Sequence, residues 1–299
     1  MSTARTAALV ASGVLALGAV AGCSSDEAAA DDGVRVVAST DVYGDLAQTI
    51  GGDRVEVTSV IDDPAADPHS YEASVRTQLA VSQADLVVEN GGGYDDFMDT
   101  LLDATDADPE VLTAVDVAGL DADAEGFNEH VWYDLGAVSE LTGRVADALA
   151  GIDPDGADAY AANALQLQEG IAGLVSRQEQ ARTTTEGAGV AITEPVPGYL
   201  LDALGARDLT PPEFAEAVEE GDDVSPAVLR ETLGLFTGGR VRALVYNEQS
   251  SGPETDQVLA AARDADVAVV GVTETLPAGE DYLSWMSDNL DAVVAALSA

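Results

Sequence analysis

Hydrophobic and polar positions alternate in the same way twice along this chain. In the first part, four short and mostly apolar runs are separated by stretches in which apolar residues recur with the period of a helix. The apolar runs are VRVVAST (34–40), VEVTSVI (55–61), ADLVVENGG (84–92) and VLTAVDV (111–117), and the helical stretches are residues 42–52, 74–83 and 94–104. Strands that alternate with helices predict a parallel sheet covered by helices on both faces.

A long helical region follows this first set of strands. Residues 135–152 have helical periodicity, the turn-forming sequence DPDG (153–156) interrupts it, and a second helix is predicted from about Ala157 to Arg182. At 1.5 Å per residue this second helix would span about 39 Å, which is longer than a typical helix of a globular domain. It is therefore long enough to connect two domains.

The alternation of strands and helices resumes in the last third of the chain. The apolar runs are GVAITE (189–194), VRALVYNEQ (241–249) and VAVVGVTETL (267–276). Helices are predicted at residues 197–206, 255–265 and 281–297, and in a segment that has Ser225 as its N-cap and Pro226 as its first helical residue. This part predicts a second, smaller α/β domain.

Side chains that can bind a metal follow the ends of four predicted strands. The chain has only two histidines: His69 follows the second strand, and His130 lies in the loop 118–133 after the fourth. Glu194 and Glu274 follow two strands of the second domain. Ligands bind beyond the carboxyl ends of strands in open parallel sheets, so the four side chains would meet in one cleft if the domains face each other. Imidazoles and carboxylates are common ligands of divalent transition metals.

The N-terminal residues predict export and lipidation. The run AALVASGVLALGAVAG (7–22) is short for a bilayer crossing, which needs about 20 residues, and suits the core of a signal peptide over residues 1–22. The sequence VAGC ends this run at Cys23, the only cysteine, and resembles a bacterial lipoprotein box, in which the cysteine becomes the lipidated first residue. Residues 23–33 are then a lipidated flexible tether.

The charge of the chain limits its partners. The formal net charge is -43, with 55 acidic and 12 basic residues, and every basic residue is an arginine. Such a surface repels the phosphates of nucleic acids and the headgroups of anionic lipids, so both are excluded as binding partners. The acyl chain at Cys23 is then the predicted attachment to a membrane.

Several segments together resemble the extracytoplasmic substrate-binding lipoproteins of zinc and manganese ABC transporters, also called metal-binding adhesin-like lipoproteins. The resemblance covers the chain from Cys23 to Ala299. The strings that carry it are VVAST (36–40), DPHSYEAS (67–74), ADLVVENG (84–91), HVWYD (130–134), DPDGADAYAANA (153–164), Gly198-Tyr199, LVYNEQ (244–249) and DYLSWMSDNL (281–290).

This resemblance implies two parallel-sheet α/β lobes joined by one long rigid helix, with the metal in the interlobe cleft. The expected boundaries are residues 34–134 for the N-terminal lobe, 135–186 for the helical region with the linking helix, and 187–299 for the C-terminal lobe. The implied function is to capture one divalent transition metal, zinc or manganese, outside the cytoplasm and to deliver it to an ABC permease, without enzymatic activity. We expect a monomer that its lipid anchors to the cell membrane.

The resemblance also implies that the metal ligands are His69, His130, Glu194 and Glu274. Relatives carry His or Glu at the third of these positions, and many carry Asp at the fourth. The loop before His130 lacks the histidine-rich insertion that is common in the zinc-specific branch. Two nitrogens with two carboxylates favour manganese relative to a shell with three histidines, but zinc would still bind, so the sequence leaves the choice of metal open.

Three further residues are predicted to support the ligands. Glu248 follows a strand and is expected to form hydrogen bonds to ligand residues rather than to bind the ion. Trp132 is expected to pack under the loop of His130 and to shield the site. Asp67 could orient the imidazole of His69, although its place before Pro68 is also explained by turn formation.

Two other functions use the same predicted ligands. A secreted zinc-dependent hydrolase would need an open coordination position and a general base, and the chain contains neither an HExxH nor a GxSxG motif. A surface adhesin with an incidental metal site is the other alternative. Binding stoichiometry and hydrolysis assays distinguish the hydrolase from the transport protein, and loss of metal uptake on deletion distinguishes the transport protein from the adhesin.

Overall fold

The computed structural model describes residues 33–298, except residues 65, 67, 69, 70, 72 and 125. The predicted signal peptide, Cys23 and all but the last residue of the predicted tether lie outside the described residues, and so do Asp67 and His69. Within the described part, no helix is long and apolar enough to span a membrane.

The first sheet contains four parallel strands in the order β2-β1-β3-β4. They are β1 (Val34–Thr40), β2 (Val55–Ile61), β3 (Leu86–Glu89) and β4 (Glu110–Thr113). The helices between them are α1 (Asp41–Gly51), η1 (Gly52–Arg54), α2 (Val75–Val81) and α3 (Phe97–Asp103). The last predicted strand was too long, because the chain turns at Ala114 into the short helix α4 (Ala114–Val117).

The second sheet is also parallel, with the strand order β6-β5-β7-β8. Its strands are β5 (Gly189–Ile192), β6 (Arg207–Asp208), β7 (Ala243–Asn247) and β8 (Ala268–Val272). Its helices are α7 (Gly198–Ala203), α8 (Pro212–Glu219), α9 (Pro226–Gly234), η5 (Leu235–Thr237), α10 (Pro253–Asp264) and α11 (Tyr282–Ser298). The sequence did not predict β6 or α8. The predicted fold class, two parallel-sheet α/β units with a long helix between them in sequence, is confirmed.

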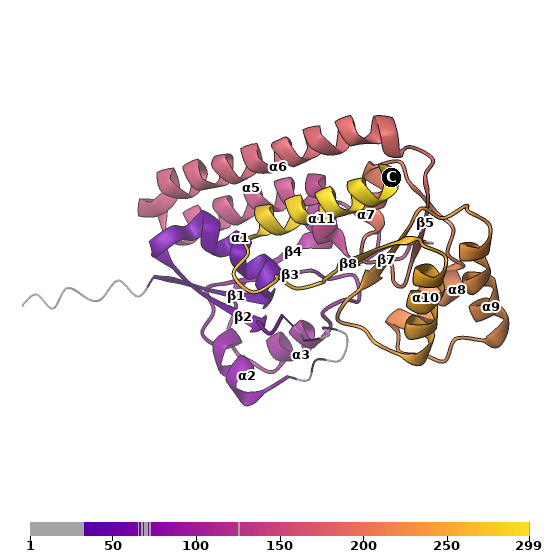
Figure 1. The fold of residues 1–299 in the computed structure, drawn as a ribbon. Coiled ribbons are helices and arrows are strands. Elements are labelled where there is room, and N and C mark those ends of the chain that lie inside the picture. The colour runs from indigo at the N-terminus through magenta and orange to yellow at the C-terminus, as the bar shows by residue number, and fades with distance from the viewer. Residues whose placement is uncertain are drawn as a thin grey trace, which may run out of the picture. The chain divides into compact units, whose positions relative to one another are not determined.

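The helical region between the sheets consists of η3 (Val131–Tyr133), α5 (Leu135–Ile152), η4 (Pro154–Gly156) and α6 (Ala157–Thr185). Helix α6 has 29 residues and ends at Thr185, shortly after its predicted end at Arg182. Its buried residues recur every three or four positions and form one stripe, which includes Leu167, Ile171 and Leu174. Figure 1 shows α6 running beside α5 and α11, which it contacts.

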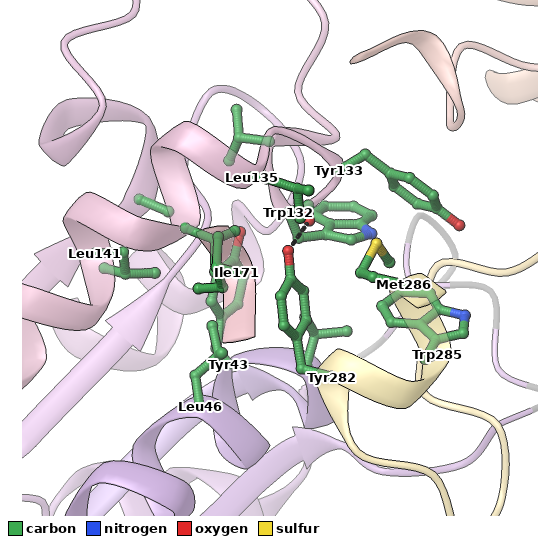
Figure 2. Close-up of a cluster of buried hydrophobic side chains, with 14 of the residues drawn as sticks. Tyr43, Leu46, Trp132, Tyr133, Leu135, Leu141, Ile171, Tyr282, Trp285 and Met286 are labelled. Atoms are coloured by element: carbon green, nitrogen blue, oxygen red, sulfur yellow. Dashed lines mark hydrogen bonds between the residues drawn. The ribbon is translucent and has the colours of Figure 1, made fainter. Parts of the chain in front are cut away.

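One continuous hydrophobic cluster contains side chains from both sheets. It includes Val36 from β1 and Val245 from β7, together with the aromatic residues shown in Figure 2. There, the hydroxyl of Tyr282 donates a hydrogen bond of 2.7 Å to the backbone oxygen of Trp132, so α11 is fixed to the segment that follows His130. The two sheets are therefore connected by a shared core as well as by α6.

Candidate metal centre

Three of the four predicted ligands lie together where strands and loops from both halves end. His130 comes directly before η3, while Glu194 and Glu274 each lie two residues beyond the ends of β5 and β8. All three are almost completely buried, with exposed fractions of 0%, 2% and 1%. The Nε2 atom of His130 lies 3.7 Å from Oε2 of Glu274. The fourth predicted ligand, His69, lies outside the described residues.

Asn247 joins the two carboxylates from the second sheet. It is the last residue of β7, and its Nδ2 donates hydrogen bonds of 2.7 Å to Oε2 of Glu194 and of 2.7 Å to Oε1 of Glu274. The hydroxyl of Ser250 donates to the other oxygen of Glu194. Asn247, a residue that the sequence analysis missed, thus donates to one oxygen of each carboxylate.

Glu248, which the sequence predicted as a supporting residue, lies elsewhere. Its side chain is exposed, and its Oε1 accepts a hydrogen bond of 3.2 Å from the hydroxyl of Tyr246. Side chains alternate between the two faces of a strand, so the residues before and after Glu248 are the ones that face the ligands. The motif YNEQ was therefore informative, but through Asn247 and Gln249.

Gln249 links the two halves of the chain beside the centre. Its Oε1 accepts a hydrogen bond of 2.5 Å from the backbone N–H of Glu274. Its Nε2 donates 2.9 Å to the backbone oxygen of Ala66 and 2.6 Å to the hydroxyl of Thr275. The loop that carries Glu274 is therefore held to the segment that precedes His69 in the sequence.

The orientation of His130 is set by Asn128. The Oδ1 atom of Asn128 accepts the backbone N–H of His130 at 3.1 Å and lies 2.8 Å from Nδ1, so Nδ1 carries the proton in the neutral imidazole. The Nδ2 atom of Asn128 in turn donates 3.0 Å to the backbone oxygen of Pro195. In this tautomer the lone pair on Nε2 points toward the carboxylates, which is the form that binds a metal.

Aromatic side chains enclose the imidazole. The ring of Trp132 is buried and lies edge-on to His130, with 5.1 Å between the centroids and 67° between the planes. Tyr94 makes a second edge-on contact at 5.9 Å. Trp132 thus occupies the position beside His130 that was predicted for it, and the two rings keep water away from one side of the imidazole.

A further carboxylate, which the sequence analysis also missed, faces His130. The Oε1 atom of Glu219, at the end of α8, lies 3.5 Å from Nε2 of His130. Glu129, His130 and Glu219 each offer one ligand atom, and these atoms lie within 4.8 Å of one another. The sequence signal for α8 was Pro212 as its first residue, followed by the amphipathic stretch EFAEAVE.

The electrostatics of the imidazole reflect these neighbours. Burial is the largest influence on the pKa of His130 and lowers it. The hydrogen bond with Glu274 and the negative charges of Glu274, Glu219 and Glu129 act in the other direction and outweigh it, so the pKa of His130 lies above its ordinary value. The carboxylates around His130 therefore favour a positive charge at this place, whether on the imidazole or on an ion bound to it.

Burial opposes the ionised form of two carboxylates at the centre, Glu194 and Glu219. Burial raises the pKa of Glu194, although hydrogen bonds from Ser250 and Asn247 oppose the shift. Burial also raises the pKa of Glu219 to about 8. A buried divalent cation would stabilise the ionised form of both groups. The centre therefore combines one imidazole nitrogen with several carboxylate oxygens, a donor set suited to zinc or manganese.

Replacing Asn247 by alanine is expected to lower the free energy of unfolding of the metal-free protein by about 1–3 kcal/mol, because two buried carboxylate oxygens lose their donor. Urea unfolding in the presence of a chelator measures this change. Asn163→Ala is the control, since it removes one side-chain hydrogen bond, to the backbone oxygen of Ile50, and should cost less. An equal or smaller loss for Asn247→Ala would contradict the bridging role.

Comparisons with known proteins show which family the chain belongs to. Residues 36–296 match the family model described as zinc-uptake complex component A, periplasmic. The manganese-binding lipoprotein MntA of Halalkalibacterium halodurans is 28% identical over 297 residues, which cover 93% of this chain and 94% of that protein. The high-affinity zinc uptake system protein ZnuA of Paracoccus denitrificans is 24% identical over 66% of this chain and 70% of its own.

Solved structures share the fold at lower sequence identity. A mutant of the laminin-binding adhesin Lmb from Streptococcus agalactiae has a TM-score of 0.76 and 21% identity, covering 89% of this chain and 100% of that one. A Mn-bound mutant of the periplasmic metal binding protein from Candidatus Liberibacter asiaticus has a TM-score of 0.73 and 20% identity, covering 88% and 99%. Because the family model matches most of the chain, this protein belongs to the periplasmic zinc-uptake component A family of metal-binding proteins.

Proposed function

We propose that this protein captures one divalent transition metal ion, zinc or manganese, outside the cytoplasm and delivers it to an ABC permease for import. The observation that supports this function most directly is the convergence of His130, Glu194 and Glu274 in a buried position, although they are far apart in the sequence. Burial and the nearby charge of Glu274 both disfavour the ionised form of Glu194, so a bound cation would offset the cost of bringing these groups together.

His69 is proposed as the fourth ligand, and with it the centre has two imidazoles and two carboxylates. The charges of Glu194 and Glu274 then neutralise a divalent ion. Residues 34–134 and 187–299 are proposed as the two lobes that supply one pair of ligands each. The contacts of Gln249 support the meeting of the two parts at one site, because they connect the segment before His69 to the loop of Glu274.

The comparisons support the transport role and its place in the cell. The relatives include a manganese-binding lipoprotein and a high-affinity zinc uptake protein, and the matching family model describes a component of a zinc-uptake complex. Members of this family bind a transported substrate and are not enzymes. We propose in addition that Cys23 carries the lipid that anchors the mature protein, and that the protein acts as a monomer.

Protein that is stripped of metal with a chelator is expected to take up one zinc or manganese ion per chain. Isothermal titration calorimetry measures the stoichiometry, and elemental analysis of protein from its native host identifies the metal carried there. His130→Ala should bind neither ion with wild-type affinity. Wild-type protein that binds no divalent ion, or hydrolyses a substrate only when zinc is bound, would overturn the transport function.

A further inference from the structure

We propose that Glu219 is an additional ligand of the transported ion, and that its carboxylate shifts the preference of the site from zinc toward manganese. This inference rests on the proposed function, because it concerns the same ion beside His130. It goes further in assigning a metal-selecting role to a residue outside the four predicted ligands.

The position of Glu219 is set by the packing of α8. This helix begins at Pro212 and buries Phe214 and Ala215. Residues four positions apart lie on the same face of a helix, so Glu219 follows Ala215 on the buried face. Only 11% of the Glu219 side chain is exposed, whereas the next residue, Glu220, is exposed. The helix thus directs a charged side chain inward.

The distances around His130 fit two oxygens that share one ion with Nε2. Oε1 of Glu219 lies 3.5 Å and Oε2 of Glu274 lies 3.7 Å from this nitrogen. Two ligands with bonds of about 2.1 Å lie about 3.0 Å apart in an octahedron and about 3.4 Å apart in a tetrahedron. Each oxygen is therefore close to the distance from Nε2 that a shared ion requires, so a small inward movement of either carboxylate would bring it within bonding distance of an ion on Nε2.

In the described part of the protein, neither a hydrogen-bond donor nor an arginine compensates the Oε1 atom of Glu219. Its Oε1 is buried and accepts no hydrogen bond from any described residue. A buried carboxylate oxygen that receives no hydrogen bond destabilises the fold, and a bound cation compensates this cost most effectively. Among the described residues, no lysine or arginine forms an ion pair with Glu219.

Glu219 is reachable from solvent on the side away from the core. A cavity of about 570 Å³ is lined by Glu219 and Glu129, together with residues of the loop before His130 and of α7. Glu219 therefore borders this cavity with one part of its side chain and faces His130 with its Oε1 atom. The cavity therefore gives solvent access to the residue whose Oε1 atom faces His130.

A further oxygen ligand changes the relative affinities for the two metals. Zinc is satisfied by four ligands and favours nitrogen donors, so a fifth group adds little to its binding. Manganese favours oxygen donors and higher coordination numbers, so it gains more from the carboxylate of Glu219. Removal of this charge should therefore weaken manganese binding more than zinc binding.

The test compares Glu219→Gln with Glu220→Gln in full-length protein, by competition with a chromophoric chelator for manganese and, separately, for zinc. Both variants replace a carboxyl group by an amide at neighbouring positions, so the exposed Glu220 controls for long-range electrostatics. We expect Glu219→Gln to lower manganese affinity by about tenfold or more and zinc affinity by a clearly smaller factor. Glu220→Gln should leave the ratio of the two affinities unchanged.

Glu219→Asp keeps the carboxylate on a shorter side chain and should recover part of the manganese preference. The electron paramagnetic resonance spectrum of bound manganese should change in Glu219→Gln and not in Glu220→Gln. Affinities that fall by the same factor for both metals, that rise, or that match those of Glu220→Gln overturn the inference. If His130→Ala binds both metals like wild type, the proposed function itself fails; if it loses both while Glu219→Gln behaves like Glu220→Gln, only the role of Glu219 fails.

Discussion

Replacing Glu274 by glutamine is expected to remove most of the rise in melting temperature that zinc or manganese gives the wild-type protein. A ligand in thousandfold excess over its Kd stabilises a fold by about 4 kcal/mol. One ligand among four contributes about 3 kcal/mol of binding, so its loss raises the Kd at least about a hundredfold and leaves about 1.4 kcal/mol of stabilisation. Differential scanning calorimetry with and without metal measures the difference.

The matched control for this substitution is Glu248→Gln. It makes the same chemical change at the end of a neighbouring strand, but its carboxylate is exposed and contacts Tyr246 instead of the ligands. This variant should keep the full metal-induced shift. His130→Ala and Glu194→Gln should lose the shift as Glu274→Gln does. If Glu194→Gln and Glu274→Gln keep it, the ion does not bind where the two halves of the chain meet.

Metal affinity is expected to fall by at least about tenfold between pH 8 and pH 6, because protons compete with the ion for the same groups. In the metal-free protein the pKa of Glu219 is raised to about 8 by burial, and the pKa of His130 is raised above its ordinary value by nearby carboxylates in spite of its burial. Both groups lose their protons when metal binds. Calorimetric titrations in buffers with different ionisation enthalpies count the protons released, and a count of zero would contradict the prediction.

The same shifts determine how the metal-free protein responds to pH. A group whose pKa is higher in the folded than in the unfolded protein stabilises the fold at low pH, and this stabilisation is lost as the pH rises through the folded value. For Glu219 this interval runs from 4.5 to about 8, and the buried carboxyls of Asp41 and Glu89, with pKa values of about 6 and about 7, act in the same direction. The melting temperature of metal-free protein should therefore fall over this interval, and the shift caused by metal should grow. A metal-free protein that becomes more stable toward pH 8 would contradict this account.

The sequence predicted the strands and the strand-end ligands well because both depend on local patterns. Apolar runs of the length of a buried strand identified seven of the strands, and the rule that sites lie beyond strand ends located Glu194 and Glu274. The two-residue strand β6 is too short for any periodicity. The fourth strand of the first sheet was predicted too long because the apolar pattern continues unchanged from β4 into α4.

The residues that the sequence did not predict act through tertiary packing. Asn247 is the last residue of a strand and does not lie beyond its end. It can donate to both carboxylates only because Glu194 lies on one side of it and Glu274 on the other. Glu219 is one of many acidic residues in an acidic chain, and only the packing of α8 distinguishes it from Glu220. The sequence alone does not identify such a residue, because glutamates are common throughout this chain and the residues next to Glu219 are of ordinary types.

The continuous hydrophobic core has a consequence for how this protein can be divided. Side chains from both sheets are packed into one cluster with those of α5, α6 and α11. A fragment that contained only one of the two sheets would expose the apolar side chains that the other half covers. Neither half therefore has a complete hydrophobic core of its own. The two halves are therefore not interchangeable modules. A chimaera that joins one half to the other half of a relative must preserve the packing of this shared core as well as the four ligands.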